Sequence, residues 1–86
     1  MRQVTFSPTG FAQYVEWSKA DVKIFQKINE LIKEAQREPF RGLGKPEPLK
    51  GNRKGSWSRR VTDEHRLVYQ VTNDAIIVRT CHGHYD

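Results

Sequence analysis

The stretch WSRRVTDEHRLVY, residues 57–69, decides how this chain folds. Two segments rich in β-formers, with Trp57 and Val61 in the first and Leu67, Val68 and Tyr69 in the second, flank a polar turn. The pattern predicts a β-hairpin that carries several arginines. Because an arginine side chain offers a planar fork of donors that suits phosphate, the hairpin is a candidate platform for an anion.

The length of the turn decides which of these arginines lie on the same face. Side chains alternate faces along a strand, so Arg60 and Arg66 share a face if the strands pair across a three-residue loop, Thr62–Glu64. A two-residue turn would put Arg60 opposite Leu67. Two-residue hairpin turns favour glycine or asparagine, and this loop contains neither. We therefore predict the longer loop, with Arg59 on the other face at the rim of the core.

The positive charge of the chain is concentrated in one segment. The formal net charge is +5, and residues 40–60 hold seven lysines and arginines against one acid, whereas the rest holds 8 basic and 9 acidic residues. A localised basic field attracts polyanions such as nucleic acid, although a solvated loop that only aids solubility is the alternative. The candidates for RNA contacts in this segment are Lys45, Lys50, Arg53, Lys54 and Arg59.

Length and composition predict one small domain that spans residues 1–86. The longest aliphatic run, Ala75–Val78, is far shorter than the roughly 20 residues that a membrane span needs. The single cysteine, Cys81, excludes an internal disulfide and fits a reducing cytoplasm. We expect a buried structural thiol rather than a reactive one.

Two helices are predicted ahead of the basic segment. Ser7, followed by a proline, can cap the first helix, and Asp21 can cap the second, which ends at or before Glu38. The connection between them is very short, which predicts an αα-hairpin. Residues 2–6 and 75–82 are predicted strands, and the unbroken apolar start of the second indicates a central position buried on both faces.

Residues 40–55 have no periodicity and are rich in glycine and proline, which predicts a long ordered loop. Within it, KPEPLK holds Glu47 between two prolines that restrict its backbone. One interpretation is an ion pair with Lys45 or Lys50 that contributes little to stability. The functional interpretation is an ionised carboxylate, held beside cations, that can accept a proton.

The residue types needed to cleave RNA without a metal are present. His65, His82 and His84 have no cysteine partner at zinc-finger spacing, and the chain has no glycine-rich nucleotide loop. Such cleavage needs a base for the 2′-hydroxyl, an acid for the leaving 5′-oxygen and donors for the phosphate. Glu47, a histidine and the arginines suit these roles, and Tyr85 could stack on a base.

The motifs KPEPLK and WSRRVTDEHRLVY, together with the C-terminal His-Tyr, resemble the YoeB (Txe/YoeB) family of the RelE/ParE toxin superfamily. The resemblance runs the whole length and includes KINELIKE at residues 27–34. It implies an α+β, microbial-ribonuclease-like fold, with two N-terminal helices on a twisted, mainly antiparallel sheet of four to five strands. It also implies ribosome-dependent cleavage of mRNA in the A site, with no cofactor.

The resemblance also implies partners and residue roles. The partners would be a YefM-type antitoxin, the 70S ribosome with its mRNA, a second copy in a homodimer, and operator DNA through the antitoxin complex, all in the bacterial cytoplasm and without a membrane. Glu47 would be the general base and His84 the general acid, while Tyr85 would orient the substrate. The residues that would stabilise the phosphate are Arg60 and Arg66, with Lys50 as a supporting cation.

Two other functions stay open. A non-catalytic module that binds RNA or the ribosome would explain the charge without Glu47 or His84. A ParE-like toxin that inhibits gyrase would use the same scaffold, but such toxins lack the C-terminal His-Tyr pair. The trailing Asp86 departs from the family pattern, and we expect its effect on the neighbouring acid to be small.

Overall fold

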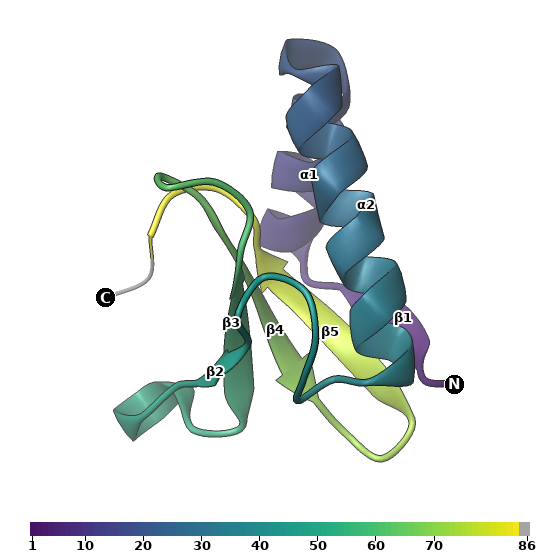
Figure 1. Cartoon of the computed structure of the whole chain (residues 1–86), viewed down its shortest axis with the longest axis vertical. Coiled ribbons are helices and arrows are strands. Elements are labelled where there is room, and N and C mark those ends of the chain that lie inside the picture. The colour runs from purple at the N-terminus through teal and green to yellow at the C-terminus, as the bar shows by residue number, and fades with distance from the viewer. Residues whose placement is uncertain (85–86) are drawn as a thin grey trace.

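The computed structural model describes residues 1–84, in which two helices pack on one face of a five-stranded sheet (Figure 1). The order of strands is β1-β5-β4-β3-β2, and only the pairing of β1 with β5 is parallel. The strands are β1 (Gln3–Phe6), β2 (Glu47–Pro48), β3 (Ser56–Arg60), β4 (Arg66–Val71) and β5 (Ala75–Thr80). The predicted α+β architecture, with a mainly antiparallel sheet, is confirmed.

Both helices begin at the predicted caps. In α1 (Pro8–Ala20), the Ser7 hydroxyl accepts a hydrogen bond from the Gly10 N–H at 3.0 Å. In α2 (Val22–Arg37), the Asp21 carboxylate accepts from two N–H groups of the first turn. Asp21 also ends α1, because its own N–H donates to the carbonyl of Trp17, so one residue separates the helices. Within the described residues, neither helix is long and apolar enough to cross a membrane.

The hydrophobic core lies between the helices and one face of the sheet. Most of its fully buried members come from α2, β4 and β5, and Cys81 follows directly after β5; the members on the three elements are Ile28, Leu31, Ala35, Leu67, Tyr69, Ile76 and Val78. Because both helices cover the same face, the other face stays open (Figure 1). The predicted central position of β5 is confirmed, but its burial on both faces is wrong, since Ile77 is half-buried and Arg79 is exposed.

The predicted long loop contains two short elements that the sequence pattern did not indicate. β2 has only two residues, and it pairs with the edge of β3 so that Glu47 lies opposite Ser58. A single 3-10 turn, η1 (Gly51–Arg53), follows it. The carboxylate predicted to lie in a loop is therefore held on the edge strand of the sheet.

Gly10 lies where α1 comes closest to the sheet. A Cβ atom at this position would collide with the backbone carbonyl of Val78 on β5. The absence of a side chain therefore allows the first turn of α1 to rest directly on β5, an interior strand of the sheet.

We expect Gly10→Ala to lower the free energy of unfolding by about 1–3 kcal/mol, the usual cost of overpacking, although alanine favours helices by about 1 kcal/mol. Urea unfolding followed by circular dichroism measures this. Glu16→Ala, at an exposed position of the same helix, is the control and should change stability by less than about 0.5 kcal/mol. Equal stability of the Gly10→Ala variant and the wild type would contradict the close contact.

Cys81, the residue directly after β5, is fully buried, and this burial raises the pKa of its thiol to about 11. The folded protein should therefore react negligibly with an aromatic disulfide reagent at pH 8, whereas the protein unfolded in urea should release one equivalent of thiolate. Rapid labelling of the folded protein would show that Cys81 is accessible.

Candidate functional site

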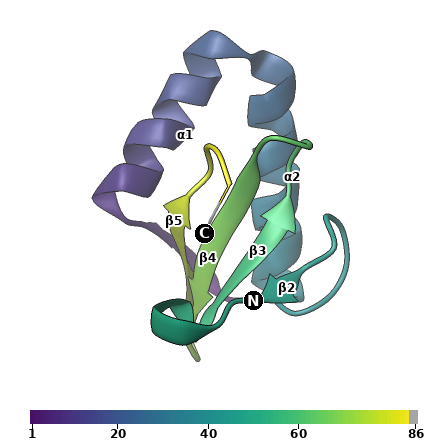
Figure 2. The same ribbon diagram turned by 90° about the vertical axis from the view of Figure 1, so that its left-hand side faces the viewer.

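The open face of the sheet carries a hollow of about 440 Å³, which we call the site hollow. Figure 2 looks onto this face, where β2, β3, β4 and β5 lie side by side in front of the helices. Three separate parts of the chain line the hollow: the loop with β2, the hairpin of β3 and β4, and the segment after β5. The lining residues are Lys45, Pro46, Glu47, Ser58, Arg60, Arg66 and His84.

The register of the hairpin places two arginines side by side in the site hollow. Arg60 pairs with Arg66, and the N–H of Val61 donates to the carbonyl of His65 at 3.0 Å. The predicted three-residue loop and the shared face of Arg60 and Arg66 are therefore confirmed. Like charges directly opposite each other on a sheet repel, so an anion bound between these two guanidinium groups would relieve the repulsion.

The Arg66 side chain is held by the turn that it follows. Its Nη1 donates to the carbonyls of Thr62, Asp63 and His65, at 2.7, 3.3 and 3.2 Å. All three bonds use one nitrogen, so within residues 1–84 the donors of Nε and Nη2 are not used by these contacts and can face a ligand. The guanidinium is thus fixed in place before any anion arrives, which is the arrangement that favours electrostatic catalysis.

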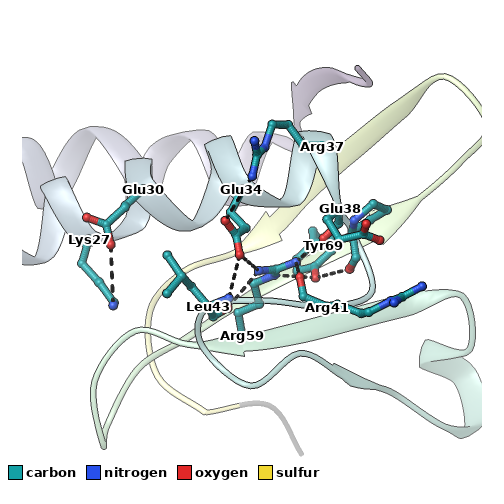
Figure 3. Close-up of polar contacts among 10 residues, drawn as sticks. Lys27, Glu30, Glu34, Arg37, Glu38, Arg41, Leu43, Arg59 and Tyr69 are labelled. Atoms are coloured by element: carbon teal, nitrogen blue, oxygen red, sulfur yellow. Dashed lines mark hydrogen bonds and ion pairs between the residues drawn. The ribbon is translucent and has the colours of Figure 1, made fainter.

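Arg59 points the opposite way and is completely buried (Figure 3). Its Nε donates to the Tyr69 hydroxyl at 2.9 Å, and the carboxylate of Glu34 lies 4.0 Å from its Nη1. Its remaining bonds go to carbonyls of the chain after α2, namely those of Glu38 (2.6 Å), Arg41 (2.9 Å) and Leu43 (2.8 Å). The expectation that Arg59 lies at the rim and contacts RNA is wrong, because every donor group faces the protein interior.

The hydrogen bonds of the Arg59 guanidinium fix the position of the loop that leads to β2. Burial raises the pKa of the Tyr69 hydroxyl, with Arg59 opposing the shift, so the hydroxyl stays protonated and donates to the carbonyl of Pro39 at 2.7 Å. Further along, the N–H of Arg60 donates to the carbonyl of Gly44 at 2.6 Å. Lys45 and Glu47 follow at once, so the buried arginine determines where the carboxylate of the site hollow lies.

The segment after β5 is held by three hydrogen bonds to two other elements, α1 and β4. The indole N–H of Trp17 donates to the carbonyl of Cys81 at 2.9 Å, and the N–H of Cys81 donates to the Gln13 side chain at 2.7 Å. At the next turn, the N–H of Arg66 donates to the carbonyl of Gly83 at 3.0 Å. The chain is thereby led back over the open face, where His84 lines the hollow.

A second hollow of about 560 Å³, the flanking hollow, shares His84 with the first. Arg53 and Lys54, predicted as RNA contacts, line this second hollow rather than the first, and Lys50 lines neither. Tyr85 lies outside the described residues, as does Asp86. Of the predicted set, the site hollow therefore brings together Lys45, Glu47, Arg60, Arg66 and His84.

Ser58 and Arg79 are among the lining residues that the sequence analysis did not name. Ser58 is 2% exposed and lies between Glu47 and Val68 across the sheet, on the face of Arg60. The same alternation that predicted Arg60 could have indicated Ser58. Arg79 lines the flanking hollow from β5, and it was overlooked because that strand was expected to be buried on both faces.

The site hollow combines groups that can accept a proton, donate a proton and bind an anion. Within residues 1–84, no cluster of three or more histidines, cysteines, aspartates or glutamates could hold a metal ion. The chemistry that the lining side chains Glu47, His84, Arg60 and Arg66 can supply is acid–base transfer beside a bound anion.

Comparison with known proteins gives a family match over nearly the whole chain. The model of the YoeB-like toxin of bacterial type II toxin–antitoxin systems matches residues 6–85. The toxin YoeB of Escherichia coli K12 is 51% identical over 83 residues, which cover 96% of this chain and 99% of that protein.

Solved structures agree with this match. The YoeB/ParE toxin from Agrobacterium tumefaciens has a TM-score of 0.93 at 45% identity, with coverage of 96% of this chain and 99% of that one. The YoeB–YefM complex from Staphylococcus aureus contains a chain with a TM-score of 0.89 at 43% identity, covering 99% of both chains. The YoeB dimer from the same species gives a TM-score of 0.90 at 45% identity, covering 98% of both. The family model and a relative of 51% identity, each matching nearly the whole chain, thus show that the chain belongs to the YoeB-like toxins of bacterial type II toxin–antitoxin systems.

Proposed function

We propose that this protein is an endoribonuclease that inhibits translation by cutting mRNA in the A site of the 70S ribosome. The observation that carries the proposal is that Glu47, His84 and two arginines line one hollow on the open face of the sheet. RNA supplies its own nucleophile, the 2′-hydroxyl, so the protein has to provide only a base, an acid and a cationic cradle.

The reaction follows from these roles. The Glu47 carboxylate accepts the 2′-hydroxyl proton while the 2′-oxygen attacks the adjacent phosphorus. The bond to the 5′-oxygen then breaks, and His84 in its protonated form donates a proton to that leaving oxygen. The products are a 2′,3′-cyclic phosphate and a free 5′-hydroxyl, and a later proton exchange with water restores both side chains. No step requires a cofactor or a metal.

The phosphate would lie against the pair formed by Arg60 and Arg66. An anion between them relieves the repulsion of like charges, and extra negative charge in the transition state strengthens both interactions. Because the turn already fixes Arg66, little reorganisation is needed. Lys45 adds a third cation at the same hollow, with Lys50 further along the loop.

RNA on either side of the cleaved bond would follow the basic surface of the open face. Arg53, Lys54 and Arg79 line the flanking hollow, which adjoins the site hollow at His84. Tyr85, next to the acid in the sequence, would orient the substrate base. Such contacts to a polyanion weaken as salt concentration rises.

The partners proposed for this chain are those of a toxin controlled by its antitoxin. The structures of a YoeB–YefM complex and a YoeB dimer, both close to this chain in sequence and fold, support a YefM-type antitoxin and a homodimer. We further propose that the antitoxin complex binds operator DNA and that the toxin acts in the bacterial cytoplasm, where its ribosome substrate is found.

We expect Glu47→Gln and His84→Gln each to lower the rate of mRNA cleavage by about 10²–10⁴-fold, the usual contribution of a general base or acid. Glu47→Gln keeps the shape of the side chain, His84→Gln keeps a polar side chain of similar reach, and both remove the proton-transfer chemistry. Primer extension on mRNA in a reconstituted translation reaction reports the rate and the cleavage position within the codon.

Glu16→Gln, on the exposed side of α1, is the matched control and should cleave at the wild-type rate. If both site variants cleave as fast as the wild type, the assigned roles are wrong. If the wild type binds ribosomes in a salt-sensitive way and yields no product at any concentration, the protein is a non-catalytic binding module. Inhibition of DNA supercoiling without mRNA cleavage would point instead to a gyrase inhibitor.

A further inference from the structure

The residue just before His84 is held by both of its backbone polar groups. The N–H of Gly83 donates to Nδ1 of His65 at 2.8 Å, and its carbonyl accepts from the N–H of Arg66 at 3.0 Å. Gly83 has a φ of +76°, a conformation open to glycine at no steric cost, which allows it to make both bonds. Two consecutive residues at the start of the second hairpin strand thereby set the path of the chain into His84.

The His65 ring is itself held in a fixed orientation by two other rings. It packs edge-on against Trp17, with centroids 4.8 Å apart and planes at 74°, and lies 4.7 Å from the ring of His82. Trp17 and His82 stack on each other at 5.3 Å. Because Trp17 also bonds the carbonyl of Cys81, the cluster joins α1, the hairpin and the segment after β5.

The bond to Gly83 requires one protonation state of His65. An imidazole nitrogen accepts a hydrogen bond only when it carries no proton, so Nδ1 must be bare and Nε2 carries the proton of the neutral ring. Burial lowers the pKa of His65, and the nearby His82 lowers it further, while Glu64 opposes the shift. At neutral pH the ring is therefore kept in the form that can accept.

The bond from Gly83 to His65 lies one residue before His84, so it restrains the backbone next to that side chain. The bonds from Trp17 and Gln13 fix Cys81, which precedes His84 by three residues. Among the described residues, His65 supplies the side-chain contact nearest to His84 along the segment. Among the hydrogen bonds between residues 1–84, its loss would leave the bond from Arg66 to restrain Gly83.

We propose that His65 is a positioning residue for the segment after β5: its Nδ1 accepts the hydrogen bond of the Gly83 amide and so directs His84 into the site hollow. The proposal rests on the proposed function, because the value of the position lies in the proton that His84 delivers. His65 itself lines neither of the two hollows, so the proposed role involves no contact with the substrate.

The test uses two nearly isosteric substitutions. His65→Asn places an amide oxygen near the position of Nδ1 and keeps an acceptor, whereas His65→Leu has a similar shape and none. The full-length variants are compared by single-turnover mRNA cleavage on ribosomes, by ribosome affinity, by thermal unfolding and by hydrogen exchange of the Gly83 amide. His65→Phe, which keeps an aromatic ring against Trp17, replaces the leucine variant if that variant does not fold.

We expect the leucine or phenylalanine variant to lose about 10²-fold in cleavage rate, the scale of a small misplacement of a catalytic group, with unchanged ribosome affinity. Its Gly83 amide should exchange faster, whereas the asparagine variant should restore both protection and much of the rate. A similar loss in both variants, or full activity in a variant whose Gly83 amide is unprotected, would overturn the proposal. If the wild type cleaves nothing, the proposed function fails, while the exchange data still report whether His65 holds Gly83.

Discussion

The buried guanidinium of Arg59 is the interaction on which the arrangement of the site depends. A cation in a protein interior is costly unless its donors are satisfied and its charge is compensated. Here three backbone carbonyls, the Tyr69 hydroxyl and the nearby Glu34 carboxylate meet that requirement. The carbonyls belong to the chain between α2 and β2, so the same contacts that satisfy the charge also fix the loop that carries Glu47.

Arg59 also explains the direction of its neighbours. Side chains alternate along a strand, so the burial of Arg59 against α2 obliges Ser58 and Arg60 to face the open side. The pairing of Arg60 with Arg66 then gathers positive charge on that side. The last part of the site comes from the far end of the chain, where Trp17, His65 and the N–H of Arg66 guide the backbone toward His84. The hairpin is thus in contact with each of the other two segments that line the hollow.

Much of this could be predicted from the sequence, because local rules govern it. Ser7 and Asp21 mark the helix starts through their capping side chains, and the composition of the Thr62–Glu64 loop fixes the register that places Arg60 beside Arg66. The membership of Glu47 and His84 in one site came from the family resemblance, since no local pattern brings the two segments together.

What the sequence did not indicate depends on contacts between distant segments. Arg59 was expected at the rim because arginine is rarely fully buried, and its partners are backbone carbonyls that no residue pattern reveals. β2 is too short to show the alternation of a strand, and it forms only because β3 offers an edge. Arg79 was missed because the apolar start of β5 predicted burial on both faces, whereas both helices cover the same face and Arg79 is exposed on the other.

The stability of Arg59→Lys against that of Arg60→Lys is the most direct test of this account. Lysine keeps the positive charge at both positions but cannot reach the same set of acceptors as the planar fork of arginine. Urea unfolding should show Arg59→Lys less stable than the wild type by at least about 2 kcal/mol, because buried carbonyls lose their donors, while exposed Arg60→Lys should change by less than about 0.5 kcal/mol. Equal stability of the two variants would contradict the claim that the buried arginine holds the site together.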